Sequence, residues 1–171
     1  MSLIVSVVEG DKIWMVSDAA LTGGTIGTLD REFLPKIEVS SKVALIGFAG
    51  DADTGAKSAR KAAEAQSFEE AIKLLTAATS QAEVEFAFAY RVNNSPKLLL
   101  ISNGHVSDVR ALYLGSKSAF ELFQKIRHGA TSPYVPLDLK SFVAGTRHNA
   151  IPKGAMDATM AMIDLFASSP E

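Results

Sequence analysis

The stretch that decides the fold is Ser2–Asp18, which reads SLIVSVVEGDKIWMVSD. Its two apolar runs, Leu3–Val8 and Ile13–Val16, are rich in β-branched residues and flank a short turn that contains Gly10. Two such runs around a short turn predict a β-hairpin. A hairpin folds the chain back on itself, so we expect the two ends of this stretch to lie close together.

Both ends of this hairpin carry polar residues that could take part in a chemical reaction. Ser2 follows Met1 directly, and removal of Met1 would give Ser2 both a hydroxyl and a free amine. Such a residue combines a nucleophile with its own base. An α-amine has a reference pKa of about 7.7–8.0, so part of it is unprotonated at neutral pH. The hairpin predicts that Asp18, at its other end, lies near this group.

Length and composition narrow the class of protein. The chain has 171 residues, of which 47% are hydrophobic, so residues 1–171 are expected to form one domain with a sizeable core. The net charge is −2, so the chain lacks the excess of positive charge that is typical of nucleic-acid-binding proteins. The absence of Cys excludes disulfides, thiolate metal sites and Cys nucleophiles. No apolar run approaches the ~20 residues of a transmembrane helix and no signal peptide precedes the first strand, so we expect a cytoplasmic protein without a membrane partner.

The rest of the chain alternates strand groups with helix groups. Hydrophobic periodicity and turn signals predict strands at 36–39, 43–46, 84–90, 98–101, 106–109 and 110–114, and helices at about 53–65, 67–78, 118–128, 137–143 and 156–166. Segregation of this kind is typical of an α+β fold with antiparallel sheet. The first helix carries small residues on its predicted inner face, which lets it lie close to a sheet (Ala52, Ala56, Ala59 and Ala63). The second begins at a capping box, Ser67 with Glu70.

Two other candidate sites are weak. The glycines of the segment 19–28 fit neither the dinucleotide fingerprint nor the P-loop, so a plain loop is the better interpretation. His105, His128 and His148 do not cluster in the sequence, and we interpret them as solvated. We therefore expect no cofactor and no metal.

Several short motifs, in order along the chain, resemble the proteasome-type N-terminal nucleophile hydrolases, with the bacterial ring-forming proteasome-like peptidase as the closest likeness. The motifs are Ser2–Val7, Asp18, Pro35–Ile37 and Gly47–Gly50, followed more weakly by Leu98–Gly104 and Leu114–Ser116. The resemblance covers residues 2 to about 127. It implies a four-layer sandwich, two antiparallel sheets flanked by helices. The family's last strands have no clear counterpart in the C-terminal part of this chain.

The resemblance also implies roles for five residues. Ser2 takes the place of the family's N-terminal Thr, and its α-amine accepts the hydroxyl proton. Lys36 lies at the position of the family's lysine, whose charge lowers the pKa of the amine. Asp18 corresponds to the aspartate that holds this lysine, and Ser116 to a supporting serine. The Gly50 amide corresponds to the donor that stabilises the oxyanion.

These roles imply an amide-bond hydrolase that acts on peptides or small amides and assembles as a homo-oligomer, either a dimer or a ring. The alternative is a non-catalytic subunit that uses the same fold for assembly. Each residue taken alone has a plain structural interpretation: a processed terminus for Ser2, a strand-end acid for Asp18, a solvated lysine for Lys36 and a tight turn for Gly50. The sequence also departs from the family pattern, since Ser replaces Thr and Ala20 replaces an arginine.

Overall fold

The computed structural model describes residues 3–17, 36–42 and 44–115. The chain divides into two units, Met1–Ser116 and Lys117–Glu171, and the fold below belongs to the first. The helices predicted after residue 117 lie outside the described residues. The elements are β1 (Leu3–Glu9), β2 (Lys12–Ser17), β3 (Ile37–Ser40), β4 (Ala44–Gly50), α1 (Ala52–Ala63), α2 (Phe68–Thr79), β5 (Val84–Val92), β6 (Ser95–Ser102), β7 (His105–Val109) and β8 (Ala111–Gly115).

The predicted N-terminal hairpin is confirmed and forms the core of a three-stranded sheet of order β2-β1-β8. Strands β1 and β2 pair antiparallel from Glu9–Lys12 to Ile4–Ser17. Gly10, in the turn between them, has a φ of +61°, a conformation that glycine adopts without steric cost. Strand β8 pairs antiparallel with the other edge of β1.

The second sheet has five strands in the order β3-β4-β5-β6-β7, all antiparallel to their neighbours. The predicted hairpin at Asn103 and Gly104 is confirmed, with positive φ at both residues. The turn predicted over Asn93–Pro96 is shorter than expected, because Ser95 already belongs to β6. Asn93 and Asn94 both have positive φ, so two residues suffice for a turn whose twist matches that of the strands.

Both predicted helix starts are capped. Asp51 caps α1 and accepts a hydrogen bond from the Thr54 N–H at 2.7 Å. Ser67 caps α2 as predicted, accepting from the Glu70 N–H at 3.1 Å. The Glu70 carboxylate accepts from the N–H of Gln66 at 2.7 Å, one residue before the position that a reciprocal capping box uses.

The larger core lies between the two helices and one face of the five-stranded sheet. That face presents large side chains, and the helices present small ones. Ala56 and Ala59 are buried as predicted, Ala63 is partly buried against the same core, and Ala62 is buried as well. Gly55 lies against the ring of Phe48, where any β-carbon would overlap it.

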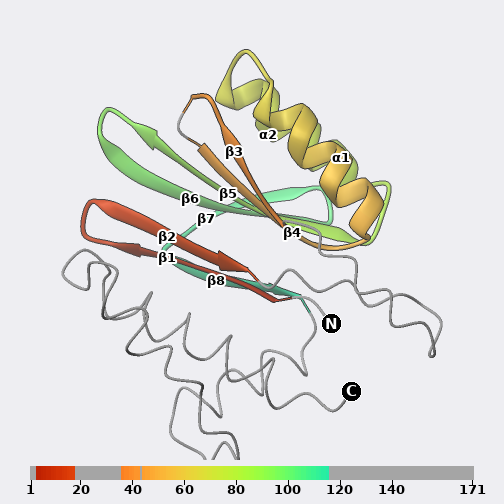
Figure 1. Cartoon of the computed structure of the whole chain (residues 1–171), viewed down its shortest axis with the longest axis horizontal. Coiled ribbons are helices and arrows are strands. Elements are labelled where there is room, and N and C mark those ends of the chain that lie inside the picture. Colours follow the sequence, from red (N-terminus) through yellow and green to blue (C-terminus); the bar gives the residue numbers. More distant parts are fainter. Residues whose placement is uncertain (1–2, 18–35, 43, 116–171) are drawn as a thin grey trace, which may run out of the picture. The chain divides into compact units, whose positions relative to one another are not determined.

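The other face of the five-stranded sheet packs on the three-stranded sheet. Ile4 and Leu114 from the small sheet contact Ala49 and Ala87 from the large one. A β-carbon at Gly47 would lie 2.8 Å from the Met15 sulfur, so glycine here permits the sheets to approach closely. Helices, large sheet and small sheet therefore form three consecutive layers (Figure 1). The fourth layer of the predicted sandwich falls on residues outside the described part.

The chain passes from one sheet to the other at Arg110, between β7 and β8. The carbonyl of Arg110 accepts a hydrogen bond from the Val8 N–H at 2.8 Å, which extends the pairing of β8 with β1. Neither α1 nor α2 is long and apolar enough to cross a membrane.

Candidate functional site

Of the five predicted site residues, Lys36 and Gly50 belong to the described part of the chain. Ser2, Asp18 and Ser116 lie outside it. The candidate site is therefore located by Lys36, by Gly50 and by the described residues that adjoin the other three in sequence, which are Leu3, Ser17 and Gly115.

Lys36 and Gly50 lie at the same end of the five-stranded sheet. The carbonyl of Lys36 accepts a hydrogen bond from the Phe48 N–H at 3.1 Å, which continues the β3–β4 ladder by one step. Gly50 follows Phe48 by two residues and is the last residue of β4. Because β3 and β4 are antiparallel, the start of one strand adjoins the end of the other.

Leu3, Ser17 and Gly115 gather at one end of the three-stranded sheet. Leu3 is directly opposite Gly115, and Ile4 is directly opposite Ser17. Ile4 in turn packs in the cluster that contains Ala49, next to Gly50. The chain neighbours of Ser2, Asp18 and Ser116 thus lie on the same side of the sandwich as Lys36 and Gly50. We call this side, defined by Leu3, Ser17, Gly115, Lys36 and Gly50, the Gly50 end.

Lys36 is only 2% exposed. Few lysines in proteins are buried to this degree unless they are paired, because desolvation of an ammonium group is costly. Taken alone, Lys36 had the plain interpretation of a solvated lysine at a strand start, and its burial removes that interpretation.

Gly50 has a φ of +107°, a conformation open almost only to glycine. A β-carbon here would overlap the carbonyl oxygen of Glu83, at the start of the neighbouring strand. The same carbonyl accepts a hydrogen bond from the Asp51 N–H at 2.9 Å. Gly50 therefore leads from a strand end directly into a helix N-terminus, where backbone N–H groups point away from the helix.

The helix cap beside Gly50 carries a stabilised negative charge. Thr54 donates hydrogen bonds to Asp51, foremost from its hydroxyl and next from its backbone N–H, and these hold the pKa of Asp51 below its ordinary value. An anionic cap complements the positive end of the α1 dipole.

One carboxylate at the Gly50 end was not singled out from the sequence. Glu85 is directly opposite Ala49 and alternates with Ala87, so it lies on the face that meets the small sheet. Its carboxylate accepts a hydrogen bond from the Ser102 hydroxyl at 2.8 Å. The signal in the sequence is a charged residue at an inward position of an otherwise small-residue strand face, which only the strand register reveals.

No cluster of His, Asp or Glu side chains within residues 3–17, 36–42 and 44–115 has an arrangement that could hold a metal ion. His105 is exposed at the start of β7, whereas His128 and His148 lie outside the described part. The described part of the candidate site at the Gly50 end comprises the buried Lys36, Gly50 before the start of α1, and Glu85.

Comparison with known proteins identifies the fold. No family model matches the sequence, and no curated protein matches it. Among solved structures, the crystal structure of eukaryotic HslV from Trypanosoma brucei is similar, with a TM-score of 0.60 and 16% sequence identity over 98% of this chain and 91% of that one. At this identity the likeness concerns the fold alone. The protein thus has an α+β sandwich fold like that of HslV, with two antiparallel sheets.

Proposed function

We propose that this protein is an amide-bond hydrolase of the N-terminal nucleophile type, acting on peptides or small amides through Ser2. The observation that supports the proposal is the gathering of Lys36, Gly50 and the sequence neighbours of the other three residues at the Gly50 end. The HslV-like fold supports it further.

In the proposed reaction, removal of Met1 gives Ser2 a free amine. The amine takes the proton of the Ser2 hydroxyl as the oxygen attacks the amide carbon. The buried charge of Lys36, held by Asp18, disfavours protonation of the amine and so lowers its pKa. The Gly50 N–H donates to the oxyanion of the tetrahedral intermediate, and Ser116 supports the amine.

Collapse of the intermediate breaks the C–N bond. The leaving nitrogen takes the proton that the Ser2 amine had accepted, and an ester with Ser2 remains. Water, activated by the same amine, then hydrolyses the ester and regenerates the free hydroxyl. Each proton accepted by the amine is returned within one cycle, so no cofactor is required.

The resemblance to ring-forming peptidases also leads us to propose a cytoplasmic homo-oligomer, either a dimer or a ring. The second candidate function is a non-catalytic subunit that uses the fold for assembly. The two candidates differ in what they require of Ser2, because an assembly subunit needs neither a free amine nor a reactive hydroxyl.

The test is labelling with an electrophile that traps hydroxyl nucleophiles, followed by intact-mass and peptide mass spectrometry. We expect the wild-type protein to lack Met1 and to gain one adduct per chain, on Ser2. Ser2→Ala should gain no adduct and should keep its circular dichroism spectrum, since chain ends carry few contacts. Ser2→Thr serves as the matched control and should keep labelling. Full retention of Met1, or equal labelling of wild type and Ser2→Ala, would favour the assembly subunit.

A further inference from the structure

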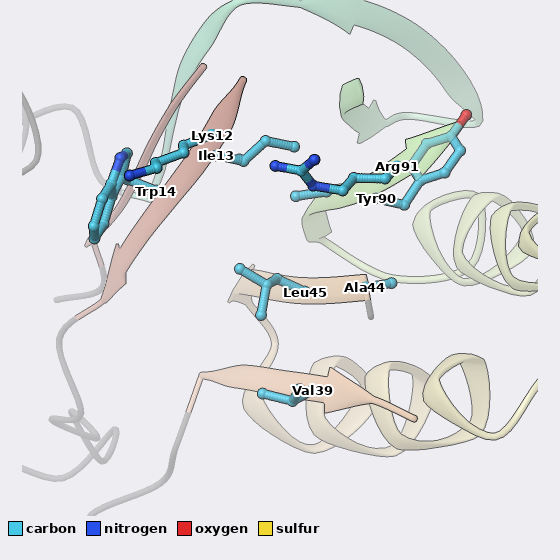
Figure 2. A pocket seen from close by; sticks show the side chains of 9 residues that line it. Lys12, Ile13, Trp14, Val39, Ala44, Leu45, Tyr90 and Arg91 are labelled. Carbon is cyan, nitrogen blue, oxygen red and sulfur yellow. The ribbon is translucent and has the colours of Figure 1, made fainter. Parts of the chain in front are cut away.

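A cavity of about 310 Å³ opens between the two sheets on the side opposite the Gly50 end. We call this side, defined by Gly10, Val39, Arg91 and the Asn93–Asn94 turn, the Gly10 end. Strand β2 forms one wall of the cavity and strands β3, β4 and β5 form the other (Figure 2). The cavity lies entirely within the first unit and contains none of the proposed catalytic residues.

The walls of the cavity are apolar. Ile13 extends from β2 toward the large sheet (Figure 2). In that sheet, Leu45 and Ala89 are directly opposite each other on the neighbouring strands β4 and β5. Val39, directly opposite Leu45 on the edge strand, is 69% exposed. Apolar surface left in contact with water favours a ligand that covers it.

The mouth of the cavity carries a fixed positive charge. Arg91 follows Ala89 by two residues, so it lies on the same face of β5, and its guanidinium points toward β2 (Figure 2). It donates one hydrogen bond to the Asn94 carbonyl at 3.3 Å and another to the Asp11 carbonyl. Two turns thus hold the guanidinium in place.

Both acceptors of Arg91 are neutral. The ion pairs within the described residues are Lys57–Asp53, Arg60–Glu38 and Lys97–Asp108, and none of them includes Arg91. A guanidinium has five N–H donors arranged in a fork that matches a carboxylate. Arg91 therefore keeps both its charge and spare donors for a ligand.

We propose that this cavity binds a small amphiphilic carboxylate, with its apolar chain between Ile13 and Leu45 and its carboxylate on Arg91. The volume lies at the low end of the range for ligand pockets, which suits a chain on the order of eight carbons. Lys12 and Arg91 both line the cavity, and the fork of the Arg91 guanidinium matches one carboxylate. The site is independent of the proposed hydrolase activity.

Isothermal titration calorimetry on the full chain tests the proposal with three probes of equal length, octanoate, octan-1-ol and octylammonium. We expect octanoate to bind at least tenfold more tightly than octan-1-ol, and octylammonium to bind more weakly still. Arg91→Gln should weaken octanoate binding at least tenfold. Lys73→Gln is the matched control, because Lys73 is exposed on α2, which covers the other face of the large sheet, and its loss should leave the affinity unchanged.

Val39→Asp gives a second variant that does not threaten folding, because Val39 is exposed. It adds a negative charge to the wall and should abolish octanoate binding. Three outcomes would overturn the proposal: equal affinity for octanoate and octylammonium, equal losses in Arg91→Gln and Lys73→Gln, or no binding of octanoate at about 1 mM. A dimer that Val39→Asp converts to a monomer would assign the cavity wall to a second copy of the chain and would also overturn it.

Discussion

The two ends of the sandwich are built from the same strands, yet they differ in how completely they are packed. At the Gly50 end, Lys36 is 2% exposed and Gly50 lies directly against the backbone of Glu83. At the Gly10 end, Val39 is 69% exposed and a cavity separates the sheets. The two sheets are therefore closely packed where the proposed catalytic residues gather, and they are separated by a cavity where none is proposed.

The cause of this difference is the size of the inward-facing side chains on β4. Toward the Gly50 end these are Gly47 and Ala49, and Gly47 leaves room for Ile4 and Met15 of the small sheet. Toward the Gly10 end the inward residue of β4 is Leu45, which meets the cavity. Small residues on one sheet allow close approach of the other.

The largest expected effect on stability comes from Gly50→Ala. The positive φ and the overlap with Glu83 together should lower the free energy of unfolding by about 4 kcal/mol, as the sum of backbone strain and overpacking. Gly10→Ala is the matched variant at the other end, where φ is also positive but no atom lies near the added carbon. It should cost only about 1–2 kcal/mol. Urea unfolding of both variants measures the difference, and equal losses would contradict the comparison.

The next effect concerns the charge of Lys36. If the proposed mechanism holds, Lys36→Met should slow labelling of Ser2 by about 100-fold, or about 2.7 kcal/mol. In the proposed mechanism Asp18 holds this charge, and methionine would leave that carboxylate without its partner, so the thermal midpoint should fall. Lys12→Met, at an exposed position of the Gly10 end, should change neither labelling nor stability by more than about 0.5 kcal/mol. Normal labelling of a folded Lys36→Met protein would exclude Lys36 from the mechanism.

A smaller effect follows from the helix cap beside Gly50. The pKa of Asp51 is lowered in the folded state, so its carboxylate contributes stability above the unfolded pKa, and this is lost as pH falls through the folded value. Asp51→Ser keeps a cap that does not titrate. Below about pH 4, the wild type should therefore lose stability relative to Asp51→Ser, by less than about 1 kcal/mol. Urea titrations at several pH values measure this, and a constant difference would contradict it.

The smallest expected effect on the free energy of unfolding comes from substitutions in the two-residue turns. Asn94→Gly, at the Gly10 end, should raise stability by about 0.5 kcal/mol, because glycine adopts positive φ at less cost than asparagine. Gly104→Asn, in the turn at the Gly50 end, should lower it by about 1–2 kcal/mol, because an added β-carbon would lie 2.7 Å from the Ser80 hydroxyl. Urea unfolding measures both changes, and the loss in Gly104→Asn should exceed the gain in Asn94→Gly. Equal and opposite shifts of the urea midpoint would contradict a difference in packing between the two turns.

Sequence reasoning succeeded where the signal is local. The β1–β2 hairpin, the Ser67 cap and the Asn103–Gly104 turn each follow from a few neighbouring residues, and all three are confirmed. The α+β class followed from the order of the elements. The assignment of Ser2, Asp18, Lys36, Gly50 and Ser116 to one catalytic site remains a prediction.

What the sequence could not supply depends on pairing between distant strands. Nothing in β8 itself indicates that it leaves β7 and pairs with β1. The inward position of Glu85 and that of Arg91 depend on strand register, because a shift of one residue moves every side chain to the other face. The cavity at the Gly10 end depends on both sheets at once.

The passage of the chain at Arg110 from one sheet to the other has a consequence for folding order. The small sheet joins the first described residues to β8, about a hundred residues later in the chain, and closing so long a loop is entropically costly. A two-stranded hairpin alone is marginal in water. The five-stranded sheet, built from sequential hairpins, can form first and present β8 to β1. The Gly50 end would then be completed in the last step of folding, so a partly folded chain would lack the proposed hydrolase site.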